Sequence, residues 1–239
     1  MLLAKTDAVD PRLPGTIHTA AEKISATGAR VLPVVGDVRD ADCVARAVDA
    51  AVDAFGGIDF CINNASGISL AGSETLAGSR FDLMQQVNVR GTWLLTQASL
   101  PHLLRSPNAH VLTLSPPLNL TPRWLGAHPG YTVSKFVMTI LTLGWAAEFS
   151  ARGIAANCLW PETLIATAAV KNVVGSENAM SDARDPQIMA DAAVRILARP
   201  SNETTGRFLL DSEVLADAGI SDLTPYGGGV SPARDLFLD

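Results

Sequence analysis

The sequence lacks the features that mark membrane, secreted, metal-binding and nucleic-acid-binding proteins. The longest apolar stretches, such as 136–147, are too short to span a bilayer and contain threonines. The three cysteines and four histidines are scattered, so neither a disulfide framework nor a metal site is expected. No run of Lys or Arg occurs and the net charge is −6, which argues against nucleic acid and anionic membranes as partners. Because the first residues also lack the pattern of a signal peptide, we expect a cytoplasmic protein.

The chain does contain enough apolar material for one sizeable core. Its 239 residues are 48% hydrophobic and 18% charged, a composition typical of a globular domain. Chains of this length with an α/β fold often form a single domain. We therefore interpret residues 1–239 as one domain.

Strand-like apolar runs alternate with helical patterns along most of the chain. Strands are expected at 1–6, 29–35, 58–63, 109–114, 154–159 and 206–211, and helices at 16–27, 41–55, 81–104, 131–150 and 186–198. This alternation predicts an α/β fold in which a doubly wound parallel sheet is covered by helices on both faces. The tail after Asp211 is expected to be irregular.

The pair Tyr131 and Lys135 is the part of the chain most suited to chemistry. Four residues apart on a helix, the two side chains share one face. A phenol titrates near pH ~10, and a neighbouring ammonium would lower its pKa toward the range useful for general acid/base catalysis. The same spacing also occurs by chance on many amphipathic helices, so its weight depends on the surrounding residues.

Small, amide and hydroxyl residues follow four of the predicted strands. They are Gly36-Asp37-Val38, Asn63-Asn64-Ala65-Ser66-Gly67, Ser115-Pro116-Pro117 and Trp160-Pro161-Glu162-Thr163. Each segment alone is typical of an ordinary turn or helix cap. Ligands of doubly wound sheets bind at the carboxyl ends of the strands, however, and four such ends would lie on one edge. Together they indicate a binding site for a flat ligand.

These segments resemble the short-chain dehydrogenase/reductase family, over about residues 1–211. Within the family, the segments Ser115–Leu120 and Trp160-Pro161 are specific signals of one branch. The resemblance implies a Rossmann-like fold and the cofactor NAD or NADP. It implies catalytic roles for Tyr131 as general acid/base, Lys135 as its partner, Asn88 as the holder of a relay water, and Ser115. It implies that cofactor is bound by Lys5, Asp37, Val38, Asn63, Ala65, Ser66, Tyr131, Lys135, Pro161 and Thr163.

The chain departs from the family pattern in two places. Ser115 lies sixteen residues before Tyr131, a longer spacing than is usual in the family, and Glu162 replaces the usual glycine. The first strand, the Gly-rich pyrophosphate turn and the first helix of the family are missing from the sequence. No remaining segment replaces the backbone donors of that turn, so little dehydrogenase activity is expected of this chain.

Three explanations of the missing segment are open. Met1 could be an internal methionine, the chain could be a fragment or degenerate copy, or it could fold as a non-enzymatic scaffold. Loss of a central strand exposes two sheet edges, and its cost would exceed the ~5 to 15 kcal/mol net stability of a typical domain. The first explanation is therefore favoured.

The sequence thus predicts an NAD(P)-dependent oxidoreductase that interconverts a carbonyl and a secondary alcohol. The alternative is a catalytically silent dinucleotide-fold fragment that acts as an interaction or oligomerisation module. Lys5, with no acidic residue at Ala4 or Thr6, modestly favours NADP over NAD. The residues at 168–170 and Met180, in the segment 164–181 that closes the family's pocket, suggest a small apolar substrate. The apolar helices 81–104 and 136–145 suggest a homodimer or homotetramer.

Overall fold

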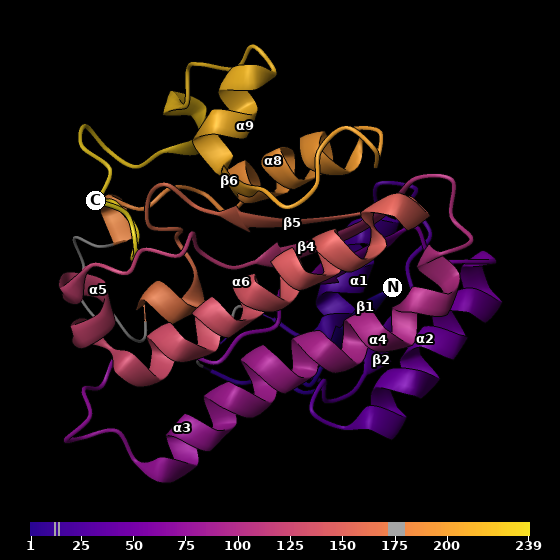
Figure 1. Cartoon of the computed structure of the whole chain (residues 1–239), viewed down its shortest axis with the longest axis horizontal. Helices are drawn as coiled ribbons and strands as arrows, with labels where there is room; N and C mark the ends of the chain where they lie inside the picture. The colour runs from indigo at the N-terminus through magenta and orange to yellow at the C-terminus, as the bar shows by residue number, and fades with distance from the viewer. Residues whose placement is uncertain (12, 14, 172–179) are drawn as a thin grey trace.

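Six strands form two separate parallel sheets in the computed structural model, which describes residues 1–11, 13, 15–171 and 180–239 (Figure 1). In the first sheet β1 (Leu2–Ala4) pairs with β2 (Pro33–Val35). The second sheet has the order β3 (Phe60–Asn63), β4 (Ala109–Leu114), β5 (Ile154–Trp160) and β6 (Phe208–Leu210). The parallel α/β fold predicted from the sequence is confirmed, but its sheet is divided between β1 and β3.

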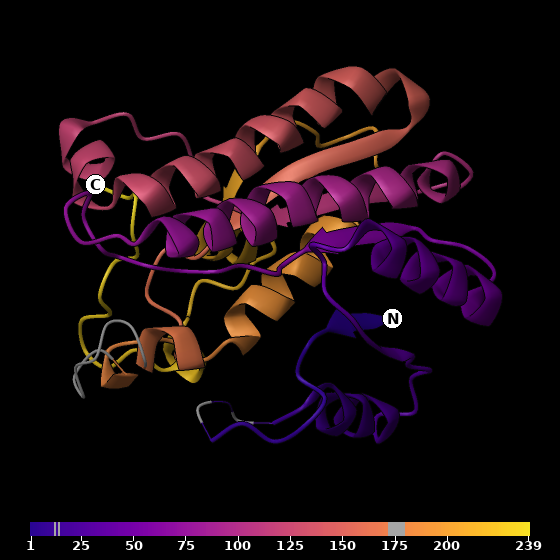
Figure 2. The same ribbon diagram turned by 90° about the horizontal axis from the view of Figure 1, so that it is seen from below.

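Helices cover both faces of the four-stranded sheet. The elements are α1 (Ile17–Ser25), α2 (Ala41–Phe55), α3 (Gly78–Met84), the π-helical turn η1 (Gln85–Gly91), α4 (Thr92–Leu103), α5 (Pro122–Ala127), α6 (Pro129–Phe149), α8 (Gln187–Leu197) and α9 (Asp211–Asp217). Figure 2 shows α4 and α6 side by side on one face. Val111 packs with the α6 residue Trp145, whereas its neighbour Leu112 packs with Ile188 of α8 on the other face. This alternation along β4 follows from the two-residue period of a strand.

The boundaries of α2 follow from the chemistry of its ends. The carboxylate of Asp40 accepts hydrogen bonds from the backbone N–H groups of Asp42 and Cys43, which have no partner inside the helix. At the other end Gly56 adopts φ +88, a left-handed conformation that ends helices and that glycine adopts without strain. The predicted bounds, 41–55, are confirmed.

The prediction of an irregular tail after Asp211 is wrong for residues 211–217, which form α9, whereas residues 218–239 are largely irregular. α9 begins at Asp211, whose buried carboxylate accepts hydrogen bonds from the N–H groups of Glu162 and Ser212. Val214 and Leu215 of this helix are fully buried against α8. These long-range contacts stabilise a helix that local sequence signals do not indicate.

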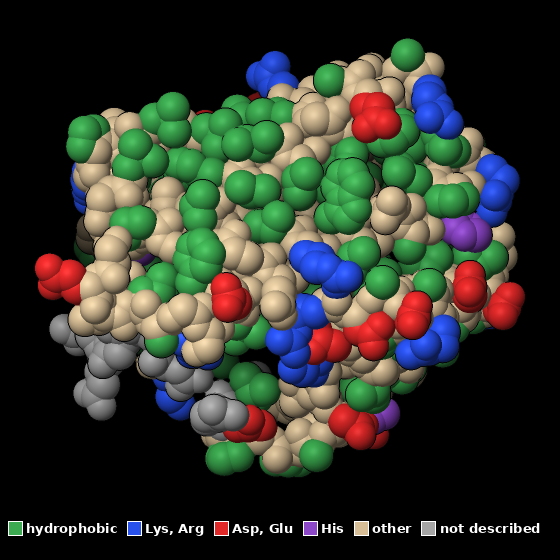
Figure 3. All heavy atoms as spheres, turned by 60° about the horizontal axis from the view of Figure 1, so that its bottom comes forward, with side chains coloured by type: hydrophobic (Ala, Val, Ile, Leu, Met, Phe, Trp, Pro, Cys, Tyr) green, Lys and Arg blue, Asp and Glu red, His purple; other side chains and the backbone are tan. Residues whose placement is uncertain are grey.

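The outer surface of α4 and α6 is rich in exposed apolar side chains. Trp93 on α4 is 43% exposed, and Val133 and Ile140 on α6 are 44% and 54% exposed. Figure 3 shows many hydrophobic side chains on the face that carries these helices. No helix in the described ranges is long and apolar enough to cross a membrane.

Candidate active site

Helix α6 places Tyr131 and Lys135 one turn apart at the carboxyl end of β4. Pro129 begins the helix, where its missing N–H costs nothing. Both side chains are buried, with 5% and 3% of their surface exposed. The Lys135 ammonium donates a hydrogen bond to the backbone carbonyl of Leu114 (2.6 Å) and lies 5.1 Å from the Trp160 ring centre. Burial lowers the pKa of Lys135 to about 8, although the negative charge of Asp235 opposes this shift.

The pKa of the Tyr131 phenol is raised, whereas the sequence led us to expect a lowered pKa. Burial of the ring raises its pKa well above the usual value, and the nearby Asp235 carboxylate raises it further. Burial therefore outweighs the expected effect of the neighbouring lysine in this state of the protein. The consequence is a phenol that stays protonated at neutral pH and could act as a proton donor.

Asn88 connects the end of β3 to the helix that carries Tyr131. It lies in η1, and π-helical turns are frequent at functional sites. Its Oδ1 accepts a hydrogen bond from the Gly67 N–H (2.6 Å), and its Nδ2 donates to the Gly67 carbonyl (3.0 Å) and to Ser134 Oγ (2.9 Å). Ser134 Oγ in turn donates to the Tyr131 backbone carbonyl (2.8 Å). Both amide hydrogens of Asn88 are used, so only its oxygen and its main chain are left to contact a further group.

Ser134 was not among the residues predicted for this site. The signal that could have found it is its position on the same turn of α6 as Tyr131 and Lys135. It is fully buried, as is Asn88. A buried serine and asparagine need hydrogen-bond partners, and here they satisfy each other.

Two further predicted residues contribute buried hydroxyls at strand ends. Ser115 directly follows β4, and its Oγ has no hydrogen-bond partner in the part of the chain that the structure describes, although it lies close to the Cys158 thiol. Thr163, two residues after Pro161, also has a buried Oγ without a partner among the described residues. Buried polar atoms of this kind are rare in proteins and often belong to binding or catalytic sites.

A cluster of charges lies at the carboxyl ends of β1 and β2. Lys5 Nζ is 3.4 Å from Asp37 Oδ2, and Arg39 contacts the same carboxylate through Nε and Nη2 at 2.9 and 2.6 Å. The Arg39 hydrogen bonds hold the pKa of Asp37 well below its usual range. Arg39 was not predicted as a site residue from the sequence. Its position two residues after Asp37 was the signal that could have found it. The cluster carries two positive charges and one negative charge.

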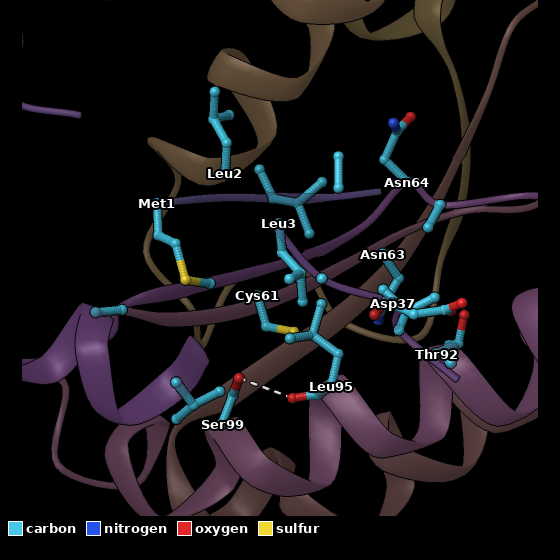
Figure 4. Close-up of a pocket in the computed structure, with 18 of the residues that line it drawn as sticks. Met1, Leu2, Leu3, Asp37, Cys61, Asn63, Asn64, Thr92, Leu95 and Ser99 are labelled. Atoms are coloured by element: carbon cyan, nitrogen blue, oxygen red, sulfur yellow. Dashed lines mark hydrogen bonds between the residues drawn. The ribbon is translucent and has the colours of Figure 1, made fainter. Parts of the chain in front are cut away.

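A cavity of about 810 Å³ lies between β1 and β3, where the two sheets are divided (Figure 4). Its middle is apolar and includes Leu3, Cys61 and Leu95. Its lining includes six of the predicted cofactor-binding residues: Lys5, Asp37, Val38, Asn63, Ala65 and Ser66. In Figure 4, Asp37, Asn63 and Asn64 lie at the same end of this cavity.

The other predicted residues do not line this cavity. Tyr131, Lys135, Ser115, Pro161 and Thr163 form a second group at the ends of β4 and β5. Gly67 lines the cavity and is hydrogen-bonded to Asn88, which connects the two groups. The structure thus brings the predicted residues to one edge of the fold in two adjoining groups.

Close packing fixes two of the cavity residues. Asn63 donates from Nδ2 to Thr96 Oγ1 of α4 (2.9 Å), while its buried Oδ1 has no partner among the described residues. Val38 packs against Gly91, where an added Cβ would lie 2.8 Å from the valine side chain. A glycine at position 91 therefore lets η1 approach the segment that follows β2 this closely.

Metal chemistry is not indicated by the described residues, among which no three His, Cys, Asp or Glu side chains form a cluster able to hold a metal ion.

The segment 164–181, which was predicted to close the substrate pocket, is described only in part, since residues 172–179 lie outside the described ranges. The candidate active site is thus defined by the two groups of residues at the strand ends, one in the cavity and one around Tyr131.

Comparisons with known proteins agree with this geometry. Residues 8–178 match the family described as short chain dehydrogenase. The chain is 45% identical over its whole length to Hydroxysteroid dehydrogenase-like protein 2 from Xenopus tropicalis, of which it covers 57%. The chain spans about half the length of the curated relatives it matches.

Solved structures of similar fold include two dehydrogenases. A short chain dehydrogenase from Mycobacterium thermoresistibile has a TM-score of 0.92 at 47% identity, with 100% of this chain and 85% of that chain covered. A gluconate 5-dehydrogenase from Burkholderia cenocepacia J2315, in complex with NADP and tartrate, has a TM-score of 0.70 at 23% identity, with 80% and 78% covered. The second likeness is one of fold alone.

Proposed function

Because the chain belongs to the short-chain dehydrogenase family, we propose that it interconverts a carbonyl and a secondary alcohol with NADP or NAD as hydride carrier. The observation that carries this proposal is the buried cation Lys135 one turn from a buried, protonated Tyr131. A buried ammonium is costly, and such groups occur mainly where function needs them. Asn88 and Ser134 fix the same helix from the side of the cavity.

In the reduction direction, each residue has a distinct role. The bound dinucleotide would supply the hydride that the carbonyl carbon accepts. Tyr131 Oη would donate its proton to the carbonyl oxygen, which becomes the alcohol hydroxyl. Lys135 would stabilise the resulting phenolate through its positive charge, and Ser115 Oγ would donate a hydrogen bond to the same substrate oxygen. A water held at Asn88 would return the proton to Tyr131.

The residues present fit the two ends of a dinucleotide. Lys5, Asp37 and Val38 would hold the adenosine end, with Asn63, Ala65 and Ser66 beside it. Pro161, Thr163, Tyr131 and Lys135 would hold the nicotinamide end, where the unpaired Thr163 hydroxyl is available. The excess positive charge of Lys5 and Arg39 over Asp37 favours the 2′-phosphate of NADP.

One observation favours a second candidate, a silent dinucleotide-fold module. The space between β1 and β3 is a largely apolar cavity, and no Gly-rich turn among the described residues that line it offers backbone donors to a pyrophosphate. A chain of this kind would keep the catalytic side chains while binding cofactor weakly. Its function would then be an interaction or oligomerisation role.

Titration with NADPH and NADH, followed by nicotinamide fluorescence, separates the two candidates. We expect saturable NADPH binding and slow reduction of acetophenone, below about 1 per second. Tyr131→Phe should lower that rate by ~10²- to 10⁴-fold while NADPH binding stays nearly unchanged. Lys135→Met should weaken NADPH binding and also lower the rate. Ser115→Ala should lower the rate less than Tyr131→Phe does. Absence of binding by either dinucleotide would favour the silent module.

A further inference from the structure

The C-terminal segment 234–239 covers the catalytic tyrosine. Phe237 is only 2% exposed, and its ring stacks on that of Tyr131 with centroids 6.2 Å apart and an interplanar angle of 30°. Three more rings surround it, those of Trp124 at 5.7 Å, Phe136 at 5.2 Å and Trp160 at 6.1 Å. We call the four rings around Phe237 the aromatic cage.

Side chains from two motifs hold this segment in place. Asn119 donates from Nδ2 to the Phe237 carbonyl (3.2 Å) and to the Asp239 carboxylate (2.8 Å). Trp160 donates from Nε1 to the Leu236 carbonyl (3.0 Å). Asn119 and Trp160 belong to the segments Ser115–Leu120 and Trp160-Pro161, which the sequence singles out, and neither of the two residues has a role in the proposed catalytic steps. Their common contact is the C-terminal segment.

Phe237 adopts an unfavourable backbone conformation at this position. Its φ is +70, which makes it the one non-glycine residue with positive φ in the described chain. For a bulky aromatic residue the left-handed region is strained, and such strain concentrates at ligand-binding and switching segments. The strain subtracts from the free energy that holds the ring in the cage, so a competing ligand can displace it more easily.

The covered tyrosine has to become accessible if it is to act on a substrate. Tyr131 is 5% exposed, and the ring stacked on it is that of Phe237. We propose that the aromatic cage is the subsite for the apolar part of the substrate, and that Phe237 occupies this subsite until a substrate displaces it. The proposal rests on the proposed role of Tyr131 as proton donor. It adds the class of substrate and the residue that substrate replaces.

The chemistry of the cage defines the ligand that fits. The cage walls are aromatic, and partly buried Leu118, Leu210 and Leu236 pack against the same cluster. A carboxylate placed among these apolar side chains would lose its hydration, so an anionic ligand is disfavoured there. The subsite therefore suits a neutral ketone or secondary alcohol that carries a phenyl-sized apolar group next to the reacting carbon.

Acetylation of tyrosine by N-acetylimidazole at neutral pH tests the cover directly. The chain has two tyrosines, and Tyr226 lies in a different hydrophobic cluster, so it serves as an internal reference. We expect Tyr131 to react at least tenfold more slowly than Tyr226 in the parent protein. Phe237→Ala, and to a lesser degree Phe237→Leu, should remove this protection. Phe149→Ala is the matched control, because it empties a buried phenylalanine site in another cluster.

Acetophenone is the probe for the subsite itself. In Phe237→Ala, millimolar acetophenone should restore slow acetylation of Tyr131, whereas 4-acetylbenzoate should not. The proposal is overturned if Tyr131 reacts as fast as Tyr226 in the parent protein, if neither Phe237 variant speeds its reaction, or if Phe149→Ala speeds it equally. Failure of acetophenone to protect Tyr131, or equal protection by the anion, would also overturn it.

This experiment needs neither cofactor nor turnover. Circular dichroism on each variant shows whether a change in acetylation reflects loss of the fold, and Phe237→Leu replaces Phe237→Ala if the latter unfolds. Protection by acetophenone without any NADPH binding would support the subsite and count against the hydride-transfer function. NADPH binding without protection would do the reverse.

Discussion

Asp235 is a carboxyl group that the folded chain keeps close to the buried Lys135. Burial raises its pKa to about 7, despite the attraction of the lysine and a hydrogen bond from the Leu236 N–H. Below about pH 4 the carboxyl is protonated in both the folded and unfolded chain. Between about pH 4 and 7 only the unfolded chain releases the proton, so this group lowers stability as the pH rises.

We expect Asp235→Asn to stabilise the protein at pH 8 and to have little effect at pH 4.5. The asparagine cannot ionise, and its Oδ1 can still accept the Leu236 hydrogen bond. The shift of the Asp235 pKa from 3.8 to about 7 already includes the attraction of Lys135 and sets an upper limit of ~4 kcal/mol, so a gain on the order of 2 kcal/mol is expected at pH 8. Urea unfolding at both pH values measures it, with the exposed Glu74→Gln as control. A loss of stability at pH 8 would contradict the assignment.

Cofactor preference depends on the two cations around Asp37. Lys5→Ala or Arg39→Ala should weaken NADPH binding about tenfold, which corresponds to ~1.4 kcal/mol, and leave NADH binding nearly unchanged. Arg30→Ala is the control, because it removes the same charge at an exposed position over the Phe55 ring. Fluorescence titration with both dinucleotides measures the ratio. Equal affinities in the parent, unaltered by either substitution, would argue against a preference for NADP.

Elements with their own local signals were predicted well from the sequence. α2 has its cap residue and terminal glycine in the sequence, and β4 is a mostly apolar run, so both were predicted with their observed bounds. The motifs at the strand ends also predicted the family and branch, which the comparisons confirm. Local chemistry suffices in these cases because each signal lies within a few residues of the element it defines.

Elements defined by distant contacts were not predicted. Residues 219–232 are rich in Gly, Pro and Ser, and nothing local indicates that Phe237, about a hundred residues after Tyr131, packs on that tyrosine. The raised pKa of Tyr131 was missed for the same reason, because it depends on burial under the C-terminal segment. A sequence pattern predicts which face of a helix is buried, but not which distant segment packs on that face.

The divided sheet predicts a difference in local stability between its parts. β1 and β2 form a sheet of two three-residue strands, which is marginal by itself, whereas β4 and β5 are almost entirely buried in the middle of the larger sheet. Amides of β1 and β2 should exchange with deuterium at least about a hundredfold faster than those of β4 and β5. This ratio corresponds to an opening free energy that is ~3 kcal/mol lower for β1 and β2. Mass spectrometry of peptic peptides measures both. Equal protection would mean that the chain unfolds as one unit.

At the scale of the whole molecule, the face formed by α4 and α6 carries several exposed apolar side chains. Trp93, Val133 and Ile140 are among them, and a contiguous exposed apolar patch on a protein marks an interaction site. The two helices lie side by side, so a two-fold axis through the face would pair each with its copy (Figure 2). We therefore propose that the chain associates through α4 and α6 as a homodimer or homotetramer.

Light scattering at micromolar concentration tests this association. The parent protein should have at least twice the mass of one chain, and Ile140→Glu should reduce it to that of a monomer, because each copy would bury an unpaired carboxylate in an apolar contact. Val194→Glu is the matched control, since Val194 is 63% exposed on α8, which lies on the opposite face of the sheet. A monomeric parent, or dissociation by Val194→Glu as readily as by Ile140→Glu, would place the apolar surface of α4 and α6 outside any interface.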